Sequence, residues 1–382
     1  MILGKQDKTS MTIENDQVVE PIDGMTLPQR YFVSEELFRE EKARIFHSQW
    51  FCVGRRQQLN QTGDYFLADV AGESLIITID ENHSLRAMFN VCRHRGCRLA
   101  TAADGQFSHS RIRCPYHRWT YDCQGELLAA PNMPDDFRAD EWPLQSAEIV
   151  EWQGFLFVHL AEEPQPIDEA FAPFWRQFDA WRMQELVVAH SEVYDLATNW
   201  KMVFQNFNEC YHCRSVHPGL DDLSPVTDCS NDFSAGPFLG GPMQLSAESM
   251  TTDGKRTAEP IRTLDDQQKQ RVYYYTMIPN MMYGLHPDFV VAWRIEPQGP
   301  SHTKIIAQWL YEPEAIQQPD FDPQPAIEFW DRTNRQDWDI CQSSYEGVCS
   351  MAYRPGPWSD SESIPRAFDQ SVLELLRNSA ES

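Results

Sequence analysis

The sequence predicts an α+β protein in which a small all-β domain precedes a domain with an antiparallel sheet flanked by helices. From Trp50 to Leu160, short apolar runs alternate with turns that contain Gly or Asp, as in a series of hairpins. A helical pattern covers residues 326–347. The 382 residues are enough for two or three domains. Before that helix, strand-like runs recur at residues 187–196, 272–278, 289–295 and 304–311.

The first 47 residues are expected to form an N-terminal arm and a helix. Residues 1–27 are polar and lack periodicity, which indicates a loose arm. Ser34 followed by two glutamates is typical of a helix start, because a serine oxygen can accept an N–H group of the first turn. The apolar side of this helix would consist of Leu37, Ala43, Ile45 and Phe46.

A proline-rich segment separates the two domains. Pro164 and Pro166 cannot continue a strand, since proline has no backbone N–H group, and they therefore indicate a linker. We accordingly expect the β domain over residues 48–162 and the larger domain over residues 163–382.

Inside the larger domain we predict two more helices and one long loop. The helices are expected over residues 167–183 and from Asn199 onward. Residues 218–260 are rich in Gly, Pro, Ser and Asp, and a loop of this length in a compact domain is usually a lid or a binding loop.

Composition restricts the partners and the compartment. A net charge of −25 argues against binding to nucleic acid or to an anionic membrane surface, because both carry the same sign. The charge is compatible with a cationic substrate or a basic redox partner. There is no apolar leader and no run of eighteen apolar residues, so a reducing, cytoplasmic location without structural disulfides is expected.

Two short motifs predict a metal centre at one end of the β domain. Cys92 and His94 form the first motif, and Cys114 and His117 form the second. Structural zinc sites usually group cysteines together and histidines together, whereas here each motif offers one of each. A two-iron cluster with two cysteines on one iron and two histidines on the other, the Rieske arrangement, requires this division. Zinc remains the alternative metal.

The amino-acid sequence around these motifs resembles that of the Rieske-type non-haem iron oxygenases. The resemblance rests on two stretches and on the aromatic residues and Gly125 that follow the second. The stretches are Asn90-Val91-Cys92-Arg93-His94-Arg95-Gly96 and Cys114-Pro115-Tyr116-His117-Arg118-Trp119-Thr120-Tyr121-Asp122.

A Rieske cluster carries an electron, so an acceptor is expected elsewhere in the chain. His212 and His217 follow a predicted apolar helix, and Pro218 would loosen that helix so that both histidines reach one ion. Asp337 lies in the middle of an apolar face of the helix at 326–347. A carboxylate there is costly unless it is paired or binds a metal, so Asp337 is the expected third ligand of a mononuclear Fe(II). A hydrogen-bonded core aspartate is the alternative.

The resemblance extends to this second region and points to the branch that acts on quaternary ammonium compounds, such as glycine betaine, carnitine and choline monooxygenases. It implies a homotrimer in which Glu209, adjacent to His212 at i, i+3, passes electrons between subunits. It also implies a separate flavin and iron–sulfur reductase that draws on NAD(P)H. The resemblance is carried by Asn208-Glu209-Cys210-Tyr211-His212-Cys213, by Trp330 to Asp337 and by Ala352-Tyr353-Arg354-Pro355-Gly356-Pro357.

Aromatic residues near the long loop are the candidates for holding a cation. A quaternary ammonium donates no hydrogen bond and is usually held by aromatic faces. We predict that at least one residue of a set of five lines the cavity above the iron, although most aromatics of this kind belong to a core. The five residues are Tyr273, Tyr275, Tyr283, Phe289 and Trp293.

Three other interpretations stay open at this point. An aromatic-ring-hydroxylating dioxygenase acting on an aromatic acid would use the same metals. An electron carrier or a zinc-stabilised binding protein is the second interpretation. It would need no second set of metal ligands, and the presence of such a set in this sequence counts against it. Cys210 and Cys213 form a Cys-x-x-Cys pair that suggests redox chemistry or zinc, but small buried side chains are the favoured interpretation.

Overall fold

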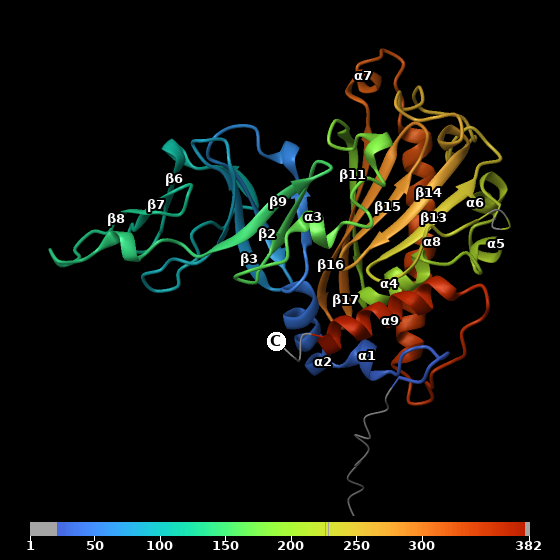
Figure 1. Ribbon diagram of the computed structural model, residues 1–382, viewed down its shortest axis with the longest axis horizontal. Helices are drawn as coiled ribbons and strands as arrows, with labels where there is room; N and C mark the ends of the chain where they lie inside the picture. Colours follow the sequence, from blue (N-terminus) through green and yellow to red (C-terminus); the bar gives the residue numbers. More distant parts are fainter. Residues whose placement is uncertain (1–20, 226, 228, 379–382) are drawn as a thin grey trace, which may run out of the picture.

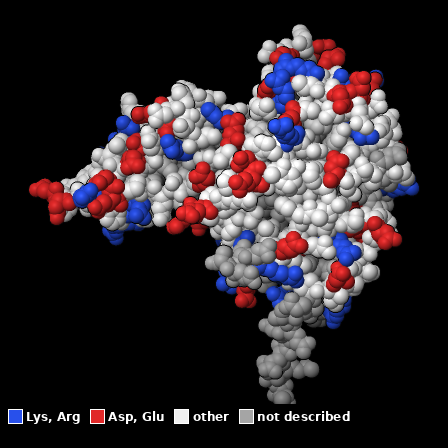
Figure 2. Space-filling view, in the orientation of Figure 1, with Lys and Arg blue, Asp and Glu red and all other residues white. Residues whose placement is uncertain are grey.

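The computed structural model describes residues 21–225, 227 and 229–378. Two antiparallel seven-stranded sheets form its two halves, with the smaller half built from the earlier part of the chain (Figure 1). The arm expected over residues 1–27 lies mostly outside the described residues. Figure 2 shows acidic and basic side chains interspersed over this face of the molecule.

The N-terminal helix begins as predicted. The Ser34 hydroxyl oxygen accepts the N–H of Leu37 at 3.2 Å, and α2 (Glu35–Glu41) starts there, after the short α1 (Arg30–Val33). A π-helical turn over Lys42–Phe46 continues it. Leu37, Ile45 and Phe46 pack into the core beside α9 (Ser363–Asn378) (Figure 1). Ala43, which was also expected on the apolar side, is exposed.

A buried ion pair joins this first part of the chain to the larger half. Glu41 on α2 accepts a hydrogen bond from the Lys201 ammonium at 2.5 Å, and its other oxygen accepts the Trp200 indole N–H at 2.8 Å. Both charged side chains are fully covered by protein. Removing one partner of such a pair leaves a buried charge without compensation.

The smaller half holds one seven-stranded sheet in the order β1-β10-β9-β4-β3-β2-β5 and a three-stranded sheet in the order β6-β7-β8. The three-stranded sheet lies at the far tip of the molecule (Figure 1). The strands are β1 (Phe51–Arg55), β2 (Asp64–Val70), β3 (Glu73–Ile79), β4 (Leu85–Phe89), β5 (Asp104–Gln106), β6 (Arg111–Arg113), β7 (Thr120–Asp122), β8 (Leu127–Ala129), β9 (Ser146–Trp152) and β10 (Phe155–His159).

The larger half is built on the second sheet, in the order β11-β17-β16-β15-β14-β13-β12. The predicted strands at 187–196, 272–278, 289–295 and 304–311 correspond to β11, β14, β16 and β17. The strands are β11 (Val187–Leu196), β12 (Phe233–Ala235), β13 (Phe238–Gln244), β14 (Arg271–Met277), β15 (Met281–Leu285), β16 (Val290–Gly299) and β17 (His302–Tyr311).

Each face of the second sheet has its own hydrophobic cluster. Helices α4, α8 and α9 pack on one face, and residues 167–186 pack on the other. The predicted helix at 326–347 is α8, while α9 had no counterpart in the sequence interpretation. The helices of this half are α3 (Ile167–Ala170), α4 (Trp200–Phe207), α5 (Cys213–Val216), α6 (Pro218–Leu223), α7 (Pro313–Ile316), α8 (Gln324–Val348) and α9 (Ser363–Asn378).

Two expectations for this half are wrong. The helix expected over 167–183 is limited to α3 and a 3-10 turn, because Pro173 interrupts the helical hydrogen bonds and the aromatic side chains of the segment are buried individually. The long loop expected over 218–260 contains the helix α6 and the strands β12 and β13, and the two strands pair with each other and with β14. Within the described residues, no helix combines the length and apolar character that a membrane crossing requires.

Candidate metal centres and cavity

The Cys/His motifs lie on two tight loops at the tip of the smaller half. Cys92 follows β4, and its N–H donates to the Cys97 carbonyl at 2.8 Å. Cys114 lies between β6 and β7, and its N–H donates to the Trp119 carbonyl at 2.8 Å. Gly96 closes the first loop with φ +70°, a conformation that glycine adopts without steric cost.

The two loops bring their histidine rings side by side and bury both of their thiols. The rings of His94 and His117 lie 4.7 Å apart between centroids, and Cys92 and Cys114 are 3% and 2% exposed. The Nδ1 atoms of both histidines are buried without a hydrogen-bond partner. Because an unpartnered buried nitrogen is costly, two such atoms beside two buried thiols fit a metal cluster.

The helix before the second motif is shorter than predicted. It ends at Phe207, where the Asn208 side-chain amide donates to the Phe204 carbonyl at 2.8 Å. Tyr211, four residues beyond the end of this helix, is 69% exposed. Glu209 starts a new turn, since its carboxylate accepts the N–H groups of Tyr211 and His212.

His212, His217 and Asp337 come together although they belong to different elements. His217 precedes Pro218 at the end of α5, and Asp337 lies on α8. One Asp337 oxygen lies 3.2 Å from His212 Nε2 and 2.7 Å from His217 Nε2. One ligand atom from each residue can be chosen so that all lie within 4.8 Å of one another, a spacing that a single metal ion can bridge.

The opposite nitrogen of each ring is held by a second residue. His212 Nδ1 lies 2.5 Å from Glu209 Oε1, and His217 Nδ1 lies 2.8 Å from Gln336 Oε1. When Nε2 binds a metal, Nδ1 carries the proton and donates it to these oxygens, which fixes the tautomer and the ring orientation. The pair of imidazoles and one carboxylate therefore fits the facial triad that holds ferrous iron.

The electrostatics of the metal-free chain are consistent with this donor set. Burial lowers the pKa of His212, but its bonds to Asp337 and Glu209 outweigh burial and raise that pKa to about 10. Burial raises the pKa of Asp337, but the bonds from both histidines bring it below its usual value. The negative charge that stabilises the imidazolium ions is the charge that would stabilise a cation between the rings.

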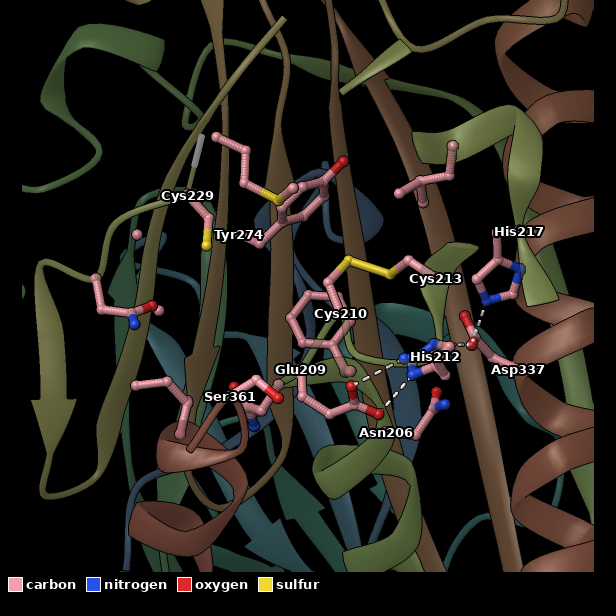
Figure 3. Close-up of a pocket in the computed structure, with 18 of the residues that line it drawn as sticks. Asn206, Glu209, Cys210, His212, Cys213, His217, Cys229, Tyr274, Asp337 and Ser361 are labelled. Atoms are coloured by element: carbon pink, nitrogen blue, oxygen red, sulfur yellow. Dashed lines mark hydrogen bonds and ion pairs between the residues drawn. A yellow bond between two sulfur atoms is a disulfide. The ribbon is translucent and has the colours of Figure 1, made fainter. Parts of the chain in front are cut away.

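A cavity of about 160 Å³ opens beside the triad. Figure 3 shows Glu209, His212, Asp337 and Tyr274 around it, with the Cys210–Cys213 disulfide between Tyr274 and the histidines in this view. Three aromatic residues contribute to the wall, namely Phe207, Tyr274 and Trp330. No lysine or arginine lines the cavity among the residues that the structure describes.

None of the five predicted aromatic residues lines this cavity, so that prediction is wrong. Three of them, Tyr273, Tyr275 and Tyr283, lie on the opposite face of the sheet among the side chains of residues 167–186. Phe289 and Trp293 are on the correct face but lie deeper, where Trp293 packs against Trp330 with ring centroids 5.4 Å apart. Strand alternation explains why Tyr274 lines the cavity while Tyr273 and Tyr275 do not, because successive side chains of a strand point to opposite faces of the sheet.

The Cys-x-x-Cys pair also differs from expectation. Cys210 and Cys213 form a disulfide, whereas two small buried thiols were favoured. Both residues line the cavity.

Four residues that the structure places in the site were not predicted from the sequence, namely Phe207, Tyr274, Trp330 and Gln336. Gln336 directly precedes Asp337, but neighbouring residues of a helix point about 100° apart, and its role depends on the approach of the His217 ring from another element. Tyr274 and Trp330 could not be separated from core aromatics, because their role depends on which face of the sheet meets which helix.

Comparisons with known proteins agree with this arrangement. A family model described as the ring hydroxylating alpha subunit (catalytic domain) matches residues 183–378, and a Rieske [2Fe-2S] domain model matches residues 49–148. The glycine betaine monooxygenase oxygenase subunit of Chromohalobacter salexigens is 30% identical, over 92% of this chain and 84% of that protein.

Two solved structures share the fold. The quaternary ammonium Rieske monooxygenase CntA in complex with L-carnitine gives a TM-score of 0.74 at 24% identity, over 92% of this chain and 95% of that chain. Naphthalene 1,2-dioxygenase from Rhodococcus bound to indole gives 0.76 at 18% identity, over 92% and 94%. At these identities the comparison establishes the fold and leaves the substrate to the site.

Proposed function

Because the chain belongs to the ring hydroxylating alpha subunit family, with a Rieske [2Fe-2S] domain ahead of the catalytic domain, we propose that it is the terminal oxygenase of a multicomponent monooxygenase acting on a quaternary ammonium compound. Its cofactors are the two-iron Rieske cluster and a mononuclear non-haem iron. When bound, this iron supplies oxygen activation, using electrons that arrive through the cluster.

We assign the iron ligands on the geometry described above. His212, His217 and Asp337 would hold the mononuclear iron, while Glu209 and Gln336 keep the Nδ1 protons in place. For the cluster, the ligands would be Cys92, His94, Cys114 and His117, and the support is the pair of unpartnered Nδ1 atoms beside two buried thiols.

The cavity wall is the observation that carries the substrate class. Phe207, Tyr274 and Trp330 contribute aromatic rings to this wall, and each ring whose face contacts a cation would contribute about 0.5–2 kcal/mol. The carboxylates of Glu209 and Asp337 add negative potential. Such a wall favours a bulky cation without hydrogen-bond donors, and no lysine or arginine among the described lining residues would repel it.

The reaction that follows is hydroxylation of a carbon attached to the quaternary nitrogen. For an N-methyl group, one oxygen atom of O2 is inserted into a C–H bond, and the other is reduced to water by two electrons from the reductase and two protons. The resulting hemiaminal breaks its C–N bond to give formaldehyde, a proton and the demethylated amine. Aromatic walls would exclude water from this space while the substrate occupies it.

Electron delivery is proposed to involve a second copy of the chain and a separate reductase. The β6–β8 tip that carries the cluster motifs lies at the opposite end of the molecule from α5 and α8 (Figure 1). A head-to-tail trimer would bring the tip of one copy to Glu209 of the next, and a flavin and iron–sulfur reductase would supply electrons from NAD(P)H.

One experiment tests the substrate class. The reduced protein is incubated without oxygen with a panel of betaines, choline and aromatic acids, then exposed to air, and formaldehyde is measured together with the other products. We expect formaldehyde in amounts equal to the demethylated amine for at least one N-methyl compound. A cis-diol from an aromatic acid, with no product from any quaternary ammonium compound, would contradict the proposal.

A further inference from the structure

The disulfide between Cys210 and Cys213 forms part of the cavity wall, where Cys210 is half-buried and Cys213 is 3% exposed. Both cysteines line the cavity that also holds the triad residues. In Figure 3 the bond lies between Tyr274 and His212 in this view, and both cysteines lie at the edge of the main hydrophobic cluster, with Cys213 buried and Cys210 half-buried. A Cys-x-x-Cys pair is the arrangement that proteins use for reversible thiol–disulfide exchange, because the second thiol can attack as soon as the first is oxidised.

The bond closes a turn that contains a candidate metal ligand. The N–H of Cys213 donates to the Cys210 carbonyl at 3.2 Å, and His212 lies inside this turn. The N–H of His217 donates to the Cys213 carbonyl at 2.7 Å, so both histidines are connected to the same short segment. With the two sulfur atoms joined, this segment can adopt fewer conformations.

We propose that Cys210 and Cys213 form a reversible redox modification site that senses peroxide and sets how firmly His212 is positioned. In the forward direction, two thiols and one hydrogen peroxide give the disulfide and two waters; the O–O bond breaks, the S–S bond forms, and both thiol protons are transferred to water. In the reverse direction, two small thiols reduce the disulfide through a mixed disulfide and leave as their own disulfide.

The inference is independent of the substrate class and goes beyond the proposed function. The oxidation of the two thiols does not depend on a metal. Only the expected change in metal affinity requires that His212 is a metal ligand, as the proposed function assigns it. Outer-shell changes around a metal site typically alter affinity by about 10–100-fold, and opening the turn removes a restraint of this kind. The disulfide form should therefore bind the metal about 10-fold more tightly than the dithiol form.

The first test follows the thiols in the full-length, metal-free protein. The fully reduced chain is treated with limiting hydrogen peroxide, the remaining thiols are alkylated, and the peptides are identified by mass spectrometry. We expect Cys210 and Cys213 to be protected from alkylation before the exposed Cys229 and Cys349, and to become reactive again after dithiothreitol. Earlier oxidation of Cys229 or Cys349, or no recovery with the reductant, would overturn the proposal.

The second test measures the affinity for cobalt(II) in the dithiol and disulfide forms. Binding by the Asp337→Ala variant is subtracted, so that only the second metal site is counted. The Cys210→Ser/Cys213→Ser double variant should show one weak affinity under both conditions, while Cys349→Ser should keep the difference between the two forms. Equal affinities of the dithiol and disulfide forms of the unaltered chain would contradict the proposal, whatever the substrate experiment shows.

Discussion

Glu209 Oε1 lies 2.5 Å from His212 Nδ1, and the second oxygen of the same carboxylate accepts the backbone N–H groups of Tyr211 and His212. One side chain therefore both shapes the turn and holds the ring within it. The carboxylate is close enough to the surface for a neighbouring molecule to approach, since Glu209 keeps 14% side-chain exposure.

The first prediction concerns this carboxylate. Glu209→Gln should leave both metal sites occupied, because the amide oxygen can still accept from the His212 ring, yet turnover should fall by at least about 100-fold through loss of the negative charge. Metal analysis and product formation are measured on the same preparation. Turnover close to that of the unaltered protein would remove Glu209 from the electron path.

The second prediction concerns metal content. The protein should hold about three irons per chain, two in the cluster and one in the mononuclear site. Cys114→Ala should abolish the cluster absorption, whereas Asp337→Ala should keep it and lose one iron. Asp339→Ala is the matched control, since Asp339 is exposed on the same helix and should keep all of the iron. Zinc at the cysteine motifs, or loss of the cluster in Asp337→Ala, would refute this assignment.

The third prediction concerns the cavity wall. Tyr274→Leu removes a ring face and should raise KM for a trimethylammonium substrate by about 2–30-fold, which corresponds to 0.5–2 kcal/mol. Tyr274→Phe keeps the ring and should change KM little. An uncharged isostere, with carbon in place of nitrogen, provides the comparison as an inhibitor. If Tyr274→Leu weakened the cation and the isostere equally, the ring would supply shape alone.

The fourth prediction concerns Asp369, which lies on α9 and is 4% exposed. Burial raises its pKa to about 7, although the bond from Gln205 and the charge of Lys201 act in the other direction. The folded protein therefore retains this proton between about pH 4 and 7 while the unfolded chain releases it. Stability should fall as the pH rises through this window.

Urea unfolding of Asp369→Asn tests that sign. The variant stays neutral, so its free energy of unfolding should exceed that of the unaltered protein by up to about 4 kcal/mol at pH 8, with no difference near pH 4. Asp339→Asn, at an exposed position, should track the unaltered protein at both values. A difference for Asp369→Asn that did not change with pH would mean that packing, not ionisation, is responsible.

The metal motifs could be predicted from the sequence because their chemistry is local. Cys92 and His94 stand two residues apart, and Pro218 forces the chain out of helical geometry next to His217. Asp337 could be inferred from the cost of a carboxylate on an apolar face. In each case a short segment carries most of the information.

The cavity wall could not be predicted because it depends on long-range packing. The alternation of β14 divides Tyr273 and Tyr275 from Tyr274, but only the docking of α4 and α8 decides which side holds the cavity. The segment after Ile167 has a helical pattern of apolar residues, yet burial between the two halves outweighs that preference. The partner of Cys210 likewise depends on how a turn closes.

The ion pair between Glu41 and Lys201 links the start of the described chain to the helix that leads into the ligand turn. Opening α2 would expose the Glu41 carboxylate to solvent and leave the Lys201 ammonium buried without a partner, at a cost of about 3–5 kcal/mol. The amides of α2 and α4 should therefore exchange with solvent deuterium in a single cooperative event. Fraying of α2, more than 150 residues before His212 in the sequence, would therefore reduce the order of the metal site. A metal bound at that site would in turn slow the amide exchange of α2 and α4.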